Sequence, residues 1–288
     1  MLRLAGAMCV TAIVIVAACG GRGDEGRLTG LIAFSSASSG ADGFADVFVI
    51  RADGTHQRRL TRLRGPEFDP SWSPNGERLV YRDSRRGINE NDEIYVMDAG
   101  SGHGTNISRN HADDWSPAWS PDGRWIAFAS ERAGSLDIWR MRPDGSQQVQ
   151  LTKRGRDEYP TWSPDSKWIA FMRLGDIWIV RADGSGARPL VSTVDEEGWP
   201  TWSPDGEKIA YVVGYERERT IWIVKADGTG ARALTKPGHD DMGVAWSPRG
   251  DELVFSRDGI LTTMRDDGSD VRSLGVRGSL PTWTASGQ

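Results

Sequence analysis

Pairs of acidic residues recur shortly before regularly spaced tryptophans in this chain of 288 residues. Each pair places two carboxylates within three positions, and carboxylates that gather in one place attract cations or basic peptide segments. The pairs are Glu67 and Asp69, Asp113 and Asp114, Asp157 and Glu158, Glu196 and Glu197, and Asp240 and Asp241. What these acids can do depends on whether the fold brings them together.

Histidine and tryptophan side chains accompany three of these pairs. His111 and His239 precede acids, in HADD and HDDM, and imidazole with carboxylate is a combination that binds metal ions. Two widely separated histidines are a sparse ligand set, so solvated loop histidines are the competing interpretation, and we expect no cofactor. Trp115 and Trp199 each follow an acidic pair and occupy no repeated position. They are candidate aromatic anchors for a partner or a sugar.

The sequence carries no motif that identifies a catalytic centre. It contains neither a G-x-S-x-G nucleophile elbow nor a glycine-rich phosphate loop followed by Lys-Ser/Thr. The formal net charge of −5 provides no basic surface for nucleic acid. Cys9 and Cys19 are the only cysteines, so the body of the chain can form no disulfide and no cysteine-based metal site.

The tryptophans that follow the acids belong to a repeated string. WSPDG occurs at Trp119 and Trp202, with the variants WSPNG, WSPDS, WSPRG and WTASG elsewhere. The anchor tryptophans stand at positions 72, 119, 162, 202, 246 and 283, which gives a period of 37 to 47 residues. A period of about 40 residues with several short strands in each unit is typical of a β-propeller.

The unit around Trp119 predicts the strands of one blade. Aromatic and β-branched runs at 117–120, 124–129, 137–142 and 148–151 are separated by turn residues, which predicts four antiparallel strands. Six copies predict an all-β fold, a six-bladed β-propeller of four-stranded antiparallel blades over residues 28–288. The first repeat begins at Leu31 with the strand that is second in the other blades, and the segment 280–284 at the end of the chain matches the first strand of a blade. The C-terminal strand is therefore predicted to complete the N-terminal blade and close the ring.

The predicted strand order assigns the connections to two faces. The WSPDG turns and the Asp-Gly turns after the third strands share one face, where they are short and uniform. The variable loops, such as 35–45 and 83–92, share the other face with the acidic pairs. Because the first strand of a blade lines the central channel, the acids, Trp115 and Trp199 are predicted to surround the channel mouth. The competing interpretation is that polar loops are simply acidic.

These motifs together resemble a known repeat. WSPDG, an Asp-Ile-Trp third strand and a following Asp-Gly-Ser/Thr turn are similar to the TolB-type, WD-like β-propeller repeat, over residues 28–288. The resemblance implies a scaffold for protein–protein interaction. TolB itself has an additional N-terminal α/β domain and is a soluble periplasmic protein, and nothing in this sequence corresponds to that domain. Its role in the Tol–Pal system is therefore not carried over to this chain.

The first 27 residues read as an export signal and a tether. Arg3 precedes an apolar run from Leu4 to Ala18 that is short for a membrane span, which predicts a signal peptide over 1–18. The residues Val-Ala-Ala before Cys19 resemble a bacterial lipobox, which implies lipidation at Cys19; a plain signal peptide is the alternative. Residues 19–27 are then a flexible, polar, lipid-anchored linker.

The sequence predicts an exported binding module, lipid-anchored to a membrane of the bacterial cell envelope on the periplasmic or outer face. We expect it to be non-catalytic and monomeric, and to bind an envelope protein or peptide, including a basic segment, at the channel mouth. The alternative is a propeller-fold enzyme, a carbohydrate lyase or hydrolase, with its site at the same mouth.

Overall fold

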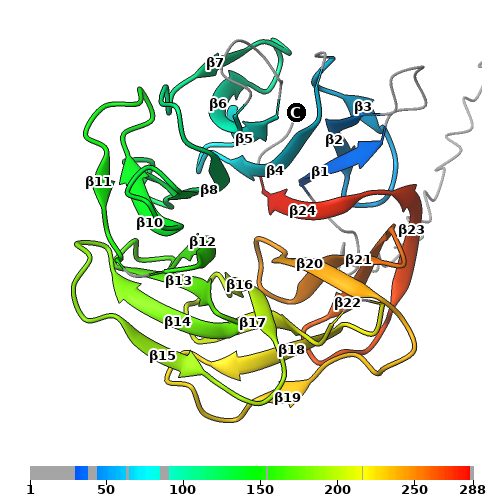
Figure 1. Ribbon diagram of the computed structural model, residues 1–288. Helices are drawn as coiled ribbons and strands as arrows, with labels where there is room; N and C mark the ends of the chain where they lie inside the picture. Colours follow the sequence, from blue (N-terminus) through cyan, green and yellow to red (C-terminus); the bar gives the residue numbers. More distant parts are fainter. Residues whose placement is uncertain are drawn as a thin grey trace, which may run out of the picture.

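The computed structural model describes residues 30–37, 44–62, 65–84, 91–153, 155–215 and 217–285. All regular structure in these residues is β-strand, arranged as six four-stranded antiparallel sheets around a ring (Figure 1). The predicted six-bladed β-propeller is therefore confirmed. We number the blades along the chain, so that blade 1 contains β1 and blade 6 ends with β23.

Each blade uses its strands in the same order from the channel outward. The innermost strands are β4 (Glu67–Trp72), β8 (Asp114–Trp119), β12 (Asp157–Trp162), β16 (Glu197–Trp202), β20 (Asp241–Trp246) and β24 (Ser279–Thr284). The second strands are β1 (Leu31–Ala37), β5 (Arg78–Asp83), β9 (Ile126–Ser130), β13 (Trp168–Arg173), β17 (Lys208–Val213) and β21 (Glu252–Arg257).

The two outer positions complete the blades. The third strands are β2 (Ala45–Arg51), β6 (Glu93–Asp98), β10 (Asp137–Met141), β14 (Asp176–Arg181), β18 (Thr220–Lys225) and β22 (Ile260–Arg265). The outermost strands are β3 (Arg58–Arg59), β7 (Gly104–Asn106), β11 (Val149–Gln150), β15 (Arg188–Val191), β19 (Arg232–Ala233) and β23 (Arg272–Arg277). Several outermost strands have only two residues, shorter than the predicted 148–151, since only part of each edge segment pairs with its neighbour.

The last strand closes the ring as the sequence predicts. β24 pairs antiparallel with β1, with Leu31 opposite Thr284 and Ile32 opposite Trp283. Figure 1 shows this contact between the two ends of the colour scale. Blade 1 is thus built from both ends of the propeller, and no blade at the junction is left with an open inner edge.

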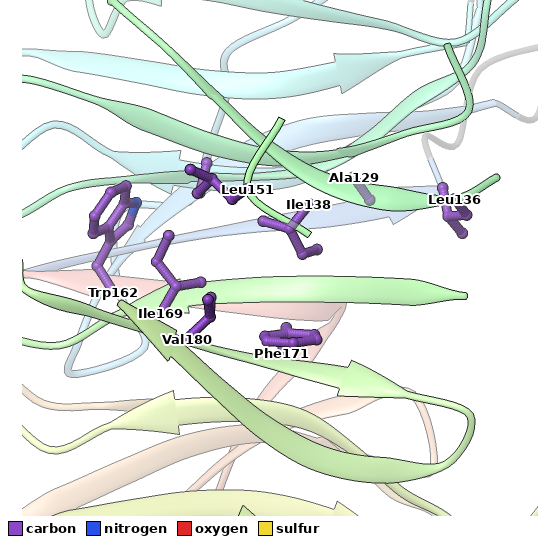
Figure 2. Packing of buried hydrophobic residues seen from close by; sticks show 9 residues of the cluster. Ala129, Leu136, Ile138, Leu151, Trp162, Ile169, Phe171 and Val180 are labelled. Atoms are coloured by element: carbon purple, nitrogen blue, oxygen red, sulfur yellow. The ribbon is translucent and has the colours of Figure 1, made fainter. Parts of the chain in front are cut away.

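The hydrophobic core lies between blades, as six clusters that each join two neighbouring blades. Figure 2 shows the cluster between blades 3 and 4, where Ile138 and Leu151 face Ile169 and Phe171. The repeat tryptophan Trp162 closes this cluster, and its indole Nε1 donates to the carbonyl oxygen of Ala118 in blade 3 at 3.1 Å. Burial of this size contributes about 1.5–3 kcal/mol per large apolar side chain, which makes the wedges between blades rigid.

The WSPDG string forms the turn between the first and second strands of a blade. Ser120 Oγ donates to Asp122 Oδ1 at 2.6 Å and accepts from the Trp125 amide at 2.9 Å. Gly123 has a φ of 72°, which glycine adopts without strain. The same serine–carboxylate contact recurs in blades 4 and 5, so the string is a structural turn.

Candidate binding site at the channel mouth

The three residues before each repeat tryptophan meet at the central channel. These residues, from all six inner strands, line a cavity of about 160 Å³. The first residue of each triplet has a left-handed backbone conformation, with φ between 48° and 59°. The residues are Asp69, Ser116, Tyr159, Trp199, Gly243 and Leu280. The pairing register of the inner strand shifts at these points, so every inner strand carries a bulge that redirects its side chains.

This backbone conformation is costly at five of the six positions. Only Gly243 adopts it freely, and proline follows each of the other five residues, a position that disfavours helical backbone angles. A left-handed non-glycine residue costs on the order of 1–3 kcal/mol, which the surrounding sheet must offset. The channel wall is therefore a ring of strained residues held by the blades.

Tyr159 and Trp199 form the aromatic part of this wall. They come from adjacent blades, and their ring centroids lie 4.8 Å apart with a tilt of 34°. Burial raises the pKa of the Tyr159 phenol, with a further contribution from the carboxylate of Glu158. The Arg219 guanidinium carbon lies 5.6 Å from the Trp199 ring. Trp199 belongs to strand β16 and not to a loop; it lines the channel and also packs against the hydrophobic cluster between blades 5 and 6.

Five of the predicted mouth acids are not available to a partner. They begin the inner strands and are fully buried, which corrects the expectation that they lie in exposed loops: Glu67, Asp114, Asp157, Glu197 and Asp241. The antiparallel register sets the first residue of an inner strand opposite the last residue of the second strand. Their carboxylates are consequently enclosed between neighbouring strands and blades.

Arginines neutralise three of these buried acids. Asp157 accepts from Arg173 Nε and Nη2, both at 2.6 Å, and Asp241 accepts from Arg257 at 2.7 and 2.8 Å. Arg132 Nη2 donates to both oxygens of Asp114 at 2.9 and 2.8 Å, and Asn110 also donates to Asp114. Burial nevertheless raises the pKa of Asp114, which Arg132 partly opposes. Each of these three carboxylates is therefore paired with an arginine and is not available to a partner.

Glu197 differs from the other buried acids because Val213 stands opposite it in the register. Thr193 Oγ1 donates to Glu197 Oε1, and the Oε2 atom is buried with no hydrogen-bond partner among the described residues. Burial raises the pKa of Glu197, and the charges of Asp176 and Asp195 raise it further. Glu67 accepts a hydrogen bond from Thr61 Oγ1 at 3.0 Å.

Three other predicted acids lie in the channel wall or the loops, where they too have partners. Asp69 lies 3.4 Å from Arg82 Nε, and burial raises its pKa despite that arginine. Asp113 Oδ1 accepts from the amide of Asp92 at 2.8 Å. Asp240 accepts from Arg219 at 2.6 and 2.7 Å, and these hydrogen bonds lower its pKa.

Trp115 does not line the mouth. It is the second residue of β8 and packs against the hydrophobic cluster between blades 3 and 4. The second position of an inner strand points into the wedge between blades and not into the channel. The expectation that Trp115 is an exposed anchor is therefore wrong.

Glu158 and Glu196 line an open hollow on the loop face, between blades 4 and 5. This hollow, here called the rim hollow, has a volume of about 390 Å³. Its lining residues are Arg156, Glu158, Met172, Leu174, Gly175, Asp176, Thr193, Val194, Asp195, Glu196 and Tyr215. Four carboxylates face one arginine there. Burial raises the pKa of Glu158, and the neighbouring Glu196 and Asp157 charges add to that effect.

Exposed apolar side chains surround the rim hollow. Val194 is 96% exposed, Leu174 is 70% exposed and Tyr215 is 64% exposed. Leu174 and Gly175 form the two-residue turn between β13 and β14, with φ values of 54° and 85°. Such turns favour Asn-Gly or Asp-Gly, so an exposed leucine there is both strained and unburied. Sequence reasoning missed these residues, and the Leu-Gly pair between two strand patterns was the signal that could have found them.

The two histidine candidates are both exposed, on the loops that enter blades 3 and 6. His239 Nδ1 lies 2.6 Å from Asp258 Oδ2. Across the residues that the structure describes, no group of three or more His, Cys, Asp or Glu side chains is arranged to hold a metal ion.

The fold and this site can now be compared with known proteins. A family model described as the TolB beta propeller domain matches residues 88–248. The chain belongs to this TolB beta-propeller family. A TolB homolog from Chlorobium luteolum is 37% identical over 46 residues, which is 16% of this chain and 11% of that protein. The chain thus matches only a small part of the length of this relative.

Two solved structures share the fold. TolB from Acinetobacter baumannii superposes with a TM-score of 0.77 at 24% identity, covering 90% of this chain and 67% of that one. A putative TolB from Agrobacterium tumefaciens gives a TM-score of 0.71 at 21% identity, covering 88% and 91%. Identities at this level establish the propeller and carry no specific activity across.

The predicted leader, the linker and the lipidation residue Cys19 lie outside the described residues. Within the described part of the chain, no helix has the length and apolar character that a membrane crossing requires.

Proposed function

We propose that this TolB-type propeller is a non-catalytic binding module of the cell envelope, and that the rim hollow receives a basic and apolar segment of a protein partner. The observation that carries the proposal is the combination of three exposed apolar side chains, Leu174, Val194 and Tyr215, with a hollow lined by four carboxylates. Exposed apolar groups with a polar rim are typical of protein interaction sites.

The charges of the rim hollow favour a cationic partner. Most other acids predicted for the mouth already accept hydrogen bonds from arginines, threonines or a backbone amide, whereas Glu158 and Glu196 line open space. A lysine or arginine that enters gains from several carboxylates at once. Because the pKa of Glu158 is raised, this charge is reduced first as the pH falls, and binding should weaken in mild acid.

The propeller supplies a rigid platform for this recognition. The hollow is continuous in sequence with the channel wall, because Glu158 adjoins Tyr159, and the short turn at Leu174 is fixed between two paired strands. A preformed site loses little conformational entropy when it binds, so a small contact area can give useful affinity.

Site-specific photo-cross-linking tests the partner site. A photoreactive residue at Val194 should give an adduct with a partner whose cross-linked segment is basic and apolar. The matched control places the same residue at Val271, which is 45% exposed in the turn between β22 and β23, on the turn face of blade 6. Neutralising Glu158 and Glu196 to glutamine should lower the yield at Val194 at least fivefold. Equal adducts at both positions, or a yield that ignores the two substitutions, would contradict the proposal.

The same proposal includes export and lipid anchoring through Cys19, with the monomeric propeller held by residues 19–27. The sequence before Cys19 supports it. Growth with an alkyne-labelled fatty acid should label the wild-type protein and leave Cys19→Ser unlabelled, with Cys9→Ser as the control. Label retained in Cys19→Ser would refute this anchor and would leave the partner site untouched.

A further inference from the structure

Another hollow between blades 4 and 5 lies on the turn face, away from the rim hollow. Between blades 4 and 5 there is a cavity of about 540 Å³, here called the turn-face cavity. Its walls are two indoles, Trp168 and Trp202, with Ile179 between them. Three turns contribute carboxylates to its edge, and the outermost strand contributes one arginine: Asp165, Asp205, Asp227 and Arg188.

The preceding interface, between blades 3 and 4, shows what fills such a space. There Arg140 lies with its guanidinium carbon 4.1 Å from the ring of Trp125. Its Nη1 donates to the carbonyl oxygen of Ala182 in blade 4 at 2.6 Å. The nearby Asp183 carboxylate supports the charged form of this arginine, whose pKa burial lowers. An aromatic face, a carbonyl and a carboxylate together make a guanidinium receptor.

The receptor groups reappear between blades 4 and 5 without their arginine. Arg140 pairs with Ala127 in the sheet, and Ile179 pairs with Ala170, so these two residues are structural equivalents. By the same register Trp168 corresponds to Trp125, and the turn Ala226-Asp227 corresponds to Ala182-Asp183. Isoleucine at position 179 therefore leaves the aromatic face, the carbonyl and the carboxylate in place with a cavity between them.

The rest of the lining agrees with a cationic occupant. Asp165, Asp205 and Asp227 each accept a hydroxyl hydrogen bond within their own turns, at 2.5 to 2.7 Å, and these bonds lower their pKa values. All three therefore stay ionised and outnumber Arg188. The Trp168 ring already has one cation beside it, because the Arg181 guanidinium carbon lies 5.2 Å from the ring centroid.

We propose that the turn-face cavity is a receptor for an arginine side chain of a partner peptide, which occupies the place that Arg140 fills within the chain. The guanidinium stacks on Trp168, donates to the Ala226 carbonyl and pairs with Asp227. This second site lies on the face opposite the rim hollow and does not depend on it.

Arg188 is the internal competitor for this cavity. It pairs with Ile179 in the sheet, and its equivalents Arg58 and Arg232 reach the corresponding carbonyl oxygens, of Ala99 at 3.4 Å and Asp266 at 3.5 Å. Replacing Arg188 with alanine should therefore tighten peptide binding about threefold, by removing a neighbouring positive charge. Weaker binding in Arg188→Ala would mean that the cavity does not select a cation, and would overturn the proposal.

Titration with a blocked Gly-Arg-Gly peptide tests the receptor directly, with the indole N–H signals of Trp168 and Trp202 followed by NMR. The matched peptide carries citrulline, which keeps the shape and removes the charge, and it should bind at least fivefold more weakly. Asp227→Asn should weaken the arginine peptide about fivefold. Asp183→Asn, at the interface already filled by Arg140, should change nothing. Ile179→Arg should abolish binding by filling the cavity from within.

The surface variant Asp227→Asn keeps the test valid if Ile179→Arg fails to fold. Equal binding of the two peptides, or signal changes confined to residues of the rim hollow, would overturn the proposal. The second result would mean that the peptide recognises only the loop face.

Discussion

The interface in front of blade 4 and the interface in front of blade 5, here called the entrances to these blades, are built from the same repeat but differ in the side chains that fill them. At the entrance to blade 4, Arg173 holds the buried Asp157 with two hydrogen bonds, and Arg140 fills the outer wedge beside Trp125. At the entrance to blade 5, Val213 faces the buried Glu197, and Ile179 leaves a cavity. The first interface has an arginine at both ends, whereas at the second Val213 stands opposite Glu197 and the outer end is a cavity with Arg188 at its edge. The same fold thus fills one interface and leaves room for a ligand at the next.

Removing the arginine from the closed entrance should have the largest effect. Arg173→Ala leaves the fully buried Asp157 without its ion pair, which should lower the free energy of unfolding by about 3–5 kcal/mol. Urea denaturation measures the change, and Arg249→Ala, at an exposed arginine in the turn between β20 and β21, is the control. A loss below about 1 kcal/mol would show that solvent or another donor reaches Asp157 and that the two entrances are alike.

Removing Arg140 from the outer part of the interface between blades 3 and 4 should lower the free energy of unfolding by less than Arg173→Ala does. Arg140→Ala removes a stacking contact and a hydrogen bond to a carbonyl, which should lower the free energy of unfolding by about 1–2 kcal/mol. The variant should also acquire binding of the Gly-Arg-Gly peptide, now visible at the Trp125 indole. Stability lost without any new binding would contradict the equivalence of the two wedges.

Replacing the unpaired acid of blade 5 should stabilise the protein. Glu197 has a raised pKa in the folded state, so its ionised form opposes folding above that pKa, and the penalty disappears as the pH falls through it. Glu197→Gln should therefore raise the free energy of unfolding at pH 8 by about 1 kcal/mol, and the gain should shrink toward pH 5. Asp113→Asn, on the loop into blade 3, is the control. A variant less stable than wild type at pH 8 would indicate a hidden partner for Glu197.

The smallest change expected is at the hairpin tip beside the rim hollow. Leu174→Asn suits the left-handed turn and should raise the free energy of unfolding by about 0.5 kcal/mol while it weakens partner capture at Val194. Thermal denaturation and the cross-linking yield measure the two effects. Opposite signs for stability and binding would indicate that the leucine is kept for recognition, whereas losses in both would show that it stabilises the turn.

The fold was readable from the sequence because every level of the repeat agrees. The tryptophan spacing, the serine–carboxylate turns and the final strand at 280–284 all predict one architecture, and β24 (Ser279–Thr284) pairs as expected. The sequence predicted exposed positions for the five buried acids because a residue type alone does not show which side chain will pair with it. In principle the register could have paired Asp157 with Arg173, since both end the same hairpin.

The features of the interface between blades 4 and 5 could not be predicted from the repeat. Glu197 looks like Asp157 in sequence until Val213 is seen opposite it, and the cavity at Ile179 exists only through comparison with Arg140. Val194 and Tyr215 stand in ordinary loop sequence, and only the folded structure shows that their side chains are exposed.

Closure of the ring by β24 also sets the order in which the protein can fold. Leu31 is among the first residues of the propeller to be synthesised, but its inner partner Thr284 is among the last. Blades 2 to 6 can assemble from local hairpins, whereas blade 1 is complete only after β1 pairs with β24 from the distant end of the chain. Because such non-local contacts form slowly, completion of blade 1 is expected to limit the folding rate, and the inner edge of β1 stays unpaired until then.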